Sequence, residues 1–421
     1  MMKSTLALVA LAIVTLFTIG CEGTKILETP EFGNGGFLSQ TNPLPDASLA
    51  RLEGVWAVVD GSRRFGDSIA IKISGDRLTL YCQPNVSYFV LEAGFLDSVV
   101  VLEGYWREQV NSNTGLARFV VPKLQGGGWV VNGGDPPPNI VIVGGFGEGN
   151  ENAVNNITLR WIRPFSEKAK QKFYTIAHRG GGRTADLLQY SENTVELLRV
   201  AERFGSNAVE IDVRLSSDGV PFLYHDNEIN PRLVKRGALI GATEDYPYSV
   251  LRQYVTLIGG EHLPTLEEAL TAIVDETNVE FVYLDTKTEN AGLISVMLPF
   301  IRDAQERASK ISGRAPFQCY IGMATQDLVD EFKAIPGHQD LPSLCELSLD
   351  ETRAIKAEVW SPRWTLGTQN DLVQQAQGEG MLAVTWTLDV DDFIHAYIRD
   401  GHFNGILTNY PSLVTYHWLM Q

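Results

Sequence analysis

The chain has 421 residues, of which 44% are hydrophobic and 20% are charged, and its formal net charge at pH 7 is -17. This length exceeds what one hydrophobic core usually supports, and the composition is that of a soluble globular protein, so we expect two domains and an extension. The negative charge argues against a nucleic-acid partner, because binding to phosphates along a strand requires a basic face.

The first 21 residues have the layout of a secretory signal that ends at a lipidation site. Lys3 precedes an apolar run over residues 6–19, which is too short for a comfortable membrane span, and a glycine stands before Cys21. This pattern resembles the signal of bacterial lipoproteins, although Thr18 replaces the usual leucine. We expect a signal peptide over residues 1–21, lipidation of Cys21, and an exported protein anchored to a bacterial membrane, facing the periplasm or the cell surface. An ordinary signal peptide and an uncleaved anchor are the alternatives.

Two regions of different character follow the signal. Residues 22–46 are rich in Gly, Pro, Asn and Thr without a sustained period, which predicts a flexible tether. Residues 47–166 contain short β-like runs separated by turn signals such as SGD and NGGDPPP, which predicts a small all-β sandwich or barrel. Its opening LEGVWAV is similar to the first strand of lipocalin-like barrels over a handful of residues only, so the role of this domain stays open.

From residue 173 onward, strand-like runs alternate with amphipathic segments of helical length, as in a parallel sheet. The runs are FYTIAHRG, NAVEIDVRLS, VPFLYHD, EFVYLDTK, QCYIGMA, SLCELSL, EVWSPRW, MLAVTWTLD and FNGILTNY, and helices are expected at 194–204, 265–275, 291–310, 326–334, 368–378 and 391–400. Only SDG separates VPFLYHD from the run before it, so VPFLYHD must fold back as a hairpin. The other eight runs predict a TIM barrel. Cys319 and Cys345 lie in consecutive runs, where a disulfide or two free thiols would fit.

Charged side chains gather at the predicted carboxyl ends of these strands, where TIM-barrel enzymes have their sites. Glu210 and Asp212 are two residues apart on one strand, so both point into the lumen, and Asp285 repeats this arrangement with Lys287. Three crowded carboxylates repel one another unless a cation joins them, and oxygen ligands suit Mg²⁺ or Ca²⁺. The alternative is a structural charge network with the nearby basic residues. We favour the metal, because buried ion pairs stabilise proteins poorly.

Several neighbouring residues have structural interpretations. Asn193 with Glu196 predicts a capping box at the start of a helix. For Glu192 two interpretations are equally favoured: it faces the site and supports Arg179 or a ligand, or it has no role in the site. Asn409 is expected to fix the turn after the last strand. The glycines at 180–182 are expected to clear bulk from beside the metal, so that a phosphate can approach the backbone.

An ordered series of short motifs carries a family resemblance. HRG, ENT, the E-x-D of VEIDV, the returning HD, the acid-x-K of LDTK, the WT of VTWTLD and the closing GILTNYP resemble the glycerophosphodiester phosphodiesterases, in that family's order, over residues 174–421. The resemblance implies a TIM barrel of the phospholipase C-like phosphodiesterase type, and hydrolysis of small glycerophosphodiesters to glycerol 3-phosphate and an alcohol. It implies one divalent ion, Ca²⁺ or Mg²⁺, and a smaller subdomain over the barrel mouth at about residues 227–263.

The resemblance also implies roles for individual residues. The general acid and base would be His178 and His225; the metal ligands Glu210, Asp212 and Asp285; the phosphate-binding residues Arg179 and Lys287; and the supporting residues Glu192 and Trp386. Asp285 stands where the family more often has glutamate, which leaves the metal affinity and the choice of ion open. Ser191 replaces the usual proline before ENT, and Arg183 lies in a long segment where it could add a contact to the substrate.

Two alternative functions follow from the same residues. One is a related phosphodiesterase that acts on phospholipids or on teichoic-acid-like polymers. Retained lipid tails would require an exposed apolar rim, and the insertion shows no obvious one. The other is a surface lipoprotein that binds phosphate esters or glycans without catalysis, for which loss of a histidine or of the acidic set would be expected, whereas all are present.

Overall fold

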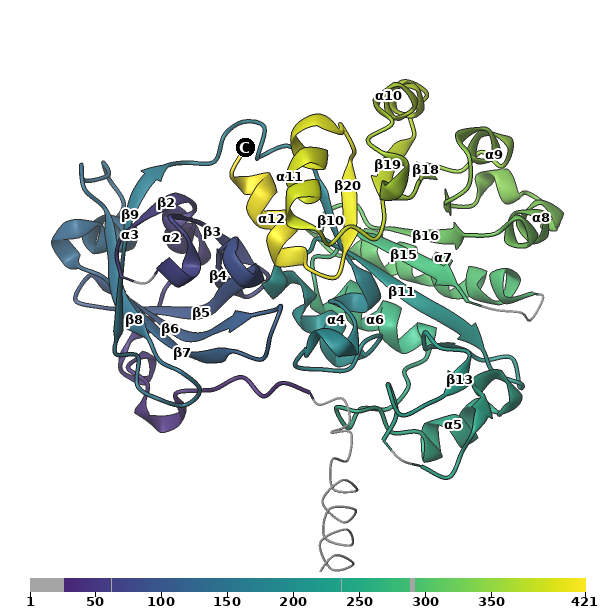
Figure 1. Ribbon diagram of the computed structural model, residues 1–421, viewed down its shortest axis with the longest axis horizontal. Helices are drawn as coiled ribbons and strands as arrows, with labels where there is room; N and C mark the ends of the chain where they lie inside the picture. Colours follow the sequence, from purple (N-terminus) through teal and green to yellow (C-terminus); the bar gives the residue numbers. More distant parts are fainter. Residues whose placement is uncertain (1–25, 62, 236, 288–291) are drawn as a thin grey trace, which may run out of the picture.

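The computed structural model describes residues 26–421 except 62, 236 and 288–291, and it contains two barrels (Figure 1). The predicted signal peptide and the predicted lipidation site at Cys21 lie outside the described residues. Among the residues that are described, none of the helices combines the length and the apolar character needed to cross a bilayer.

The N-terminal domain is a closed antiparallel barrel, which decides between the two predicted all-β architectures. Its strands are β2 (Gly54–Gly61), β3 (Ser68–Ser74), β4 (Arg77–Tyr81), β5 (Ser87–Leu96), β6 (Val99–Glu108), β7 (Thr114–Val121), β8 (Val141–Phe146) and β9 (Asn155–Arg163). Each strand pairs with the next one, and β9 pairs with β2 to close the barrel. The ring of Phe65 lies 4.5 Å from that of Phe89 and 5.0 Å from that of Phe146, so aromatic side chains fill the interior.

Short elements attach the chain that precedes this barrel. Strand β1 (Asn42–Pro43) pairs with β5, and helices α2 (Asp46–Leu49) and α3 (Gly127–Asn132) pack together. The amide of Leu27 donates to the carbonyl of Leu188, 2.9 Å away, in the C-terminal domain. The segment expected to be a flexible tether therefore lies against the folded protein over its described part, because its backbone groups find partners there.

The C-terminal domain is a TIM barrel with the predicted number of strands. They are β10 (Tyr174–Ala177), β11 (Ala208–Leu215), β15 (Phe281–Thr286), β16 (Gln318–Met323), β17 (Ser343–Cys345), β18 (Val359–Trp360), β19 (Leu382–Thr385) and β20 (Gly405–Thr408). All pair in parallel, and β10 pairs with both β11 and β20, so the sheet closes. Strand β12 (Pro221–Leu223) runs antiparallel to β11, which confirms the predicted hairpin.

Helices cover the outside of this barrel (Figure 1). They are α4 (Val195–Val200), α6 (Leu266–Glu276), α7 (Leu293–Lys310), α8 (Gln326–Ala334), α9 (Leu349–Ala354), α10 (Asn370–Gly378), α11 (Asp391–Asp400) and α12 (Pro411–Leu419). Along β11 the outward residues Val209 and Ile211 join the core beneath these helices, whereas the inward Ala208 belongs to the apolar layer within the barrel. The described cysteines, Cys82, Cys319 and Cys345, are buried and free.

The insertion after β12 forms a small subdomain of its own. It contains the hairpin β13 (Glu228–Ile229) and β14 (Gly241–Ala242) and the helix α5 (Tyr248–Tyr254). Leu233, Leu251 and Leu257 form part of its hydrophobic core. The position after the returning strand agrees with the predicted insertion at 227–263.

Candidate active site

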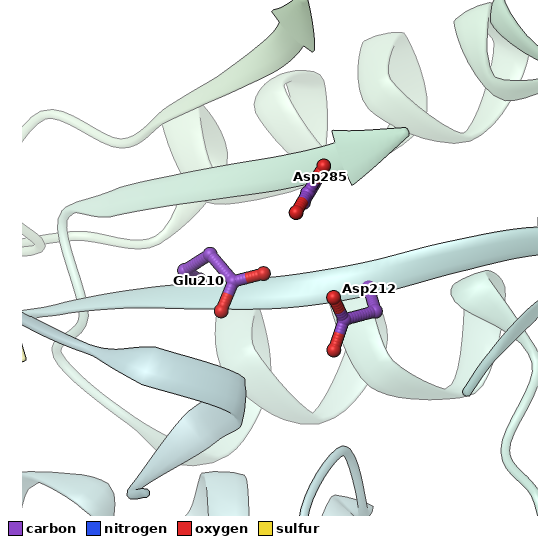
Figure 2. Close-up of side chains that lie close together, drawn as sticks. All are labelled: Glu210, Asp212 and Asp285. Atoms are coloured by element: carbon purple, nitrogen blue, oxygen red, sulfur yellow. The ribbon is translucent and has the colours of Figure 1, made fainter. Parts of the chain in front are cut away.

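Three carboxylates meet inside the C-terminal barrel, as the alternation along the strands predicts. Glu210 and Asp212 lie on β11, Asp285 lies on the neighbouring β15 directly opposite Asp212, and Figure 2 shows the three carboxyl groups pointing toward one another. One oxygen of each carboxylate lies within 4.8 Å of an oxygen of both others. The Glu210 and Asp212 side chains are only 2% and 0% exposed, and that of Asp285 is 15% exposed.

The negative charge of this cluster is only partly balanced by the neighbouring basic residues. Burial, reinforced by Asp212 and Asp285, raises the pKa of Glu210 well above its usual value. Burial also raises the pKa of Asp285, against the opposing effect of Lys287, whose Nζ lies 2.5 Å from Asp285 Oδ2. For Asp212 burial is again the largest effect, but Lys287, His225 and Arg179 together hold its pKa below the usual value. A further cation would therefore stabilise the ionised forms of Glu210 and Asp285.

The donor set fits a hard divalent cation. Oε1 of Glu210 and Oδ1 of Asp212 are buried and have no hydrogen-bond partner among the described residues. Asp212 Oδ1 does lie 3.4 Å from Nζ of Lys287, an ion-pair contact without hydrogen-bond geometry. Buried carboxylate oxygens without donors are costly unless a cation binds them. The structure thus brings the predicted metal ligands together, and it places Lys287 beside two of them.

Asn193 clamps one of these acids, which corrects the predicted capping box. Its Nδ2 donates to Asp212 Oδ2 at 2.6 Å, and its Oδ1 accepts from the amide of Asp212 at 3.0 Å. Its φ of +59° is a left-handed conformation that asparagine tolerates better than most residues. The cap of helix α4 is instead Thr194, whose side chain accepts from the amide of Leu197. Within the ENT motif, the residue that caps the helix is therefore the threonine and not the asparagine.

His178 is held in one tautomer by Asn409 and Asp389, which are distant in sequence but lie beside it in the barrel. Its Nδ1 lies 2.7 Å from Oδ1 of Asn409, and Nδ2 of Asn409 donates to Oδ2 of Asp389 at 2.6 Å. Because Asp389 fixes the orientation of the Asn409 amide, the oxygen faces His178, and Nδ1 must carry the proton. Burial and the neighbouring Arg179 lower the pKa of His178 to about 4, so the ring is neutral at pH 7 with its lone pair on Nε2. The expectation that Asn409 only fixes a turn is therefore too narrow.

Arg179 is buried behind the acid cluster and is shared between two carboxylates. Its Nη1 donates to Glu192 Oε1 at 2.6 Å, and its Nε lies 3.7 Å from Asp212 Oδ2. Glu192 also pairs with Arg232 and accepts from the amide of Thr184, which shows that it faces the site and supports Arg179. Arg179 has a φ of +54°, a costly backbone conformation for a residue with a side chain.

His225 reaches the cluster from the returning strand. Its Nδ1 lies 2.6 Å from Oδ1 of Asp226, and Asp226 is in turn paired with Arg232. The amide of Tyr224 donates to the carbonyl of Asp212, 3.1 Å away, so the hairpin brings this histidine beside the acids. The carboxylate on Nδ1 leaves Nε2 as the reactive nitrogen of His225.

One half-buried acid of the site was not predicted. Glu346 follows β17 and accepts a hydrogen bond from the hydroxyl of Tyr283. Burial, reinforced by Asp285, raises its pKa to about 8. Glu346 stands at a strand end within the run SLCELSL, as the other acids do in theirs, so the sequence did contain this signal. Trp386, which was predicted, is half-buried at the end of β19, with the Arg363 guanidinium 4.8 Å from the centre of its ring.

The three glycines of the first motif face the protein rather than the acid cluster. A Cβ on Gly181 would lie 2.8 Å from the Leu197 side chain, and one on Gly180 would lie 3.1 Å from that of Leu198. Close packing against helix α4, and not space for a phosphate, therefore accounts for these two. Arg183 pairs with Asp186, its Nη2 2.8 Å from Oδ1, within its own loop.

The motif-bearing residues also match known proteins. The model of the Glycerophosphoryl diester phosphodiesterase family matches residues 178–297. Glycerophosphodiester phosphodiesterase 1 of Mus musculus is 33% identical over 108 residues, which are 25% of this chain and 31% of that protein. Glycerophosphodiester phosphodiesterase of Bacillus subtilis is 22% identical over 269 residues, covering 58% of this chain and 85% of the relative.

A solved glycerophosphodiester phosphodiesterase from Parabacteroides distasonis has a TM-score of 0.47 and 22% identity, and the alignment covers 60% of this chain and 100% of that one. The chain spans 31–35% of the length of the first mammalian relatives. The family match begins at His178 and lies wholly within the C-terminal barrel, outside the N-terminal one. Over this part of the C-terminal domain, the chain is similar to the glycerophosphoryl diester phosphodiesterase family.

Proposed function

We propose that the C-terminal barrel hydrolyses glycerophosphodiesters to glycerol 3-phosphate and an alcohol with the help of one divalent cation. The observation that carries the proposal is the meeting of His178 and His225 with the acids Glu210, Asp212 and Asp285 at one end of the barrel. The names of the relatives agree with this activity. A protein that only bound its ligand would need neither two histidines nor a desolvated acidic cluster beside them.

The metal would be held by Glu210, Asp212 and Asp285. When bound, a Ca²⁺ or Mg²⁺ ion would supply positive charge to the phosphate oxygens and would lower the pKa of a nearby hydroxyl group. Asn193 fixes the orientation of Asp212 through two hydrogen bonds, so this ligand is preorganised. Arg179, held by Glu192, adds a buried guanidinium next to the cluster for the phosphate.

The two histidines have surroundings that suit opposite proton transfers. His178 is neutral with an unprotonated Nε2, so it would accept the proton of the glycerol 2-hydroxyl as that oxygen attacks phosphorus. His225 is held through Nδ1 by the carboxylate of Asp226, which leaves Nε2 to carry a proton to the substrate, so it would protonate the alcohol oxygen as its bond to phosphorus breaks. Water would then open the cyclic phosphate with the roles reversed, which gives glycerol 3-phosphate.

The decisive experiment is an assay of residues 22–421 with glycerophosphocholine, measuring glycerol 3-phosphate. We expect release that EDTA abolishes and that Ca²⁺ or Mg²⁺ restores, and loss of release in His178→Ala and Asp212→Asn. His402→Ala is a matched histidine control, because His402 lies in an exposed loop after α11. This variant should retain full activity. Release that persists with EDTA, or in His178→Ala, contradicts the mechanism. If no glycerophosphodiester is cleaved, the activity itself is excluded.

A second candidate substrate is supported by an apolar rim outside the insertion. Leu366, on the segment that follows β18, is 64% exposed; Val390, just before α11, is 46% exposed; and Phe393, in the first turn of α11, is 48% exposed and packs against Trp364. An exposed apolar group beside a polar site suits a substrate that retains an acyl chain. The test compares kcat/KM for lysophosphatidylcholine with that for glycerophosphocholine in wild type and in Phe393→Ser. An equal effect of the substitution on both substrates excludes this candidate.

We further propose that the protein is exported and anchored to a bacterial membrane through a lipid on Cys21. The support is the sequence pattern of a basic residue, a short apolar run and a cysteine. Labelling with radioactive palmitate and fractionation of cells that express the wild type or Cys21→Ala would test it. A wild-type protein without label, or a variant that stays in the membrane fraction, would exclude the anchor.

A further inference from the structure

We propose that the N-terminal barrel completes the active site of the C-terminal one, with Gln109 and Arg107 acting as positioning residues for His178 and Arg179. The inference rests on the proposed phosphodiesterase function. Both residues lie where β6 ends and the hairpin to β7 begins, and this hairpin contacts the loops that follow β10 and β20. Those loops carry the HRG motif and Asn409.

Gln109 reaches across the domain boundary to the residue that orients His178. Its side chain is buried, and its Nε2 donates to the carbonyl of Asn409 at 2.8 Å. The N-terminal barrel thus holds the backbone carbonyl of Asn409, while Asp389 holds its backbone amide and its side chain. Because Oδ1 of Asn409 contacts Nδ1 of His178, a displacement of Asn409 changes the position and the tautomer of the histidine.

Gly182, two residues after the HRG motif, makes room for this contact. A Cβ on Gly182 would lie 3.0 Å from the carbonyl oxygen of Asn409 and 3.6 Å from Nε2 of Gln109. The φ of Gly182 is +137°, which side-chain-bearing residues rarely adopt. Gly182 therefore lets the first and last loops of the barrel close around the amide of Gln109.

Arg107 supports the same region through a different loop. It is 2% exposed, and its Nη2 donates to the carbonyl of Leu187 at 2.9 Å, while its Nη1 binds carbonyls of its own hairpin. The loop that it holds also contains Thr184, whose amide donates to Glu192. Glu192 is the partner of Arg179. One guanidinium from the N-terminal barrel thus stabilises the segment that fixes the predicted phosphate-binding arginine.

These contacts are separate from those that join the two barrels elsewhere. Arg203 forms a two-pronged ion pair with Asp76, at 2.8 and 2.9 Å, and precedes the amino end of β11, at the end of the barrel opposite the site. The ring of Tyr88 also packs 5.6 Å from that of Phe204. The hairpin contacts can therefore be removed one at a time while the barrels stay joined, which makes their role testable.

The test compares Gln109→Leu, which keeps the size of the side chain and removes the donor, with Arg203→Gln, which cuts the distant ion pair. We expect Gln109→Leu to lower kcat on the order of tenfold, as for the loss of one hydrogen bond, with little change in KM. Nitrogen NMR of ¹⁵N-histidine-labelled protein, with His178 assigned from His178→Ala, should show that the Nδ1-protonated form is no longer the sole tautomer. Arg203→Gln should change neither readout.

A second variant and the melting temperatures keep the outcome interpretable. In Arg107→Lys the ammonium group keeps the charge but cannot bind the carbonyls of the hairpin and of Leu187 at once, so we expect a lower kcat for this variant as well. Its melting temperature should lie within a few degrees of that of Arg203→Gln. Equal kcat values for Gln109→Leu and Arg203→Gln, with an unchanged His178 signal, overturn the proposal. If even the wild type releases no glycerol 3-phosphate, the proposed function fails, whereas the His178 tautomer still tests the positioning role.

Discussion

The substitution Asp389→Asn tests how the orientation of one amide controls a proton acceptor. Oδ1 of Asp389 accepts from the hydroxyl of Thr408 at 2.9 Å and from the amide of Asn409 at 2.8 Å, and its Oδ2 accepts from Nδ2 of Asn409 at 2.6 Å. The introduced side chain has one oxygen, which should stay with the two donors at the Oδ1 position. Its NH₂ group then faces Nδ2 of Asn409, and two donors oppose each other.

Asn409 can relieve this clash only by turning its amide over. Its Nδ2 then faces Nδ1 of His178, which must become an acceptor, so the ring proton moves to Nε2, the nitrogen that should receive the substrate proton. To regain the working tautomer the site must leave a buried donor unpaired, at about 1–3 kcal/mol. At about 1.4 kcal/mol per factor of ten, kcat should fall roughly 5- to 150-fold. KM should hardly change, because Arg179 and the acids are untouched.

The assay is glycerol 3-phosphate release at pH 8, far above the pKa of about 4 for His178, so that protonation of the ring does not limit the rate. The double variant Asp389→Asn/Asn409→Asp is the matched rescue, because the new carboxylate accepts both from the introduced amide and from Nδ1 of His178. A single variant with kcat within twofold of wild type, or a double variant no faster than the single one, would refute this reasoning.

Three further outcomes are expected. Asn193→Leu leaves Asp212 without its amide donor and should weaken Ca²⁺ or Mg²⁺ binding about 10- to 100-fold in calorimetric titrations; unchanged affinity contradicts this. Burial raises the pKa of Glu346 to about 8, so the folded protein keeps a proton that the unfolded chain loses above about pH 4.5. The unfolding free energy of the metal-free protein should therefore fall between about pH 4.5 and 8, by up to roughly 1.4 kcal/mol per pH unit. Glu346→Gln should flatten this pH dependence in urea unfolding. Ser191→Pro removes two hydrogen bonds to Glu261 and should lower the unfolding free energy by about 1–3 kcal/mol in the same assay, whereas equal stability would mean that water replaces them.

The sequence predicted the C-terminal barrel and its acid cluster because both follow from local periodicity. Strand β11 alternates between the outer core and the lumen, so Glu210 and Asp212 had to share a face, and the short SDG turn had to return the chain toward them. Six of the helices were placed for the same reason. The helix expected at 291–310 begins at Leu293, and residue 291 lies outside the described residues.

Contacts between distant parts of the chain were not predictable in this way. The choice between a sandwich and a barrel depends on whether β9 pairs with β2, and the alternation of side chains is the same in both architectures. The links from Asn409 to His178 and from Gln109 to Asn409 join residues 231 and 300 positions apart. Single polar residues at the ends of strands carry no signal for such partners.

The contact between His178 and Asn409 also bears on when the protein becomes active as it folds. His178 follows β10, the first strand of the barrel, and Asn409 follows β20, the last one, and these strands pair along the seam that closes the sheet. A chain in which β20 has not yet docked has an open sheet and a histidine without its partner. Hydrolysis should therefore begin only after the last strand has docked against the first, so that closure of the barrel sets the onset of activity.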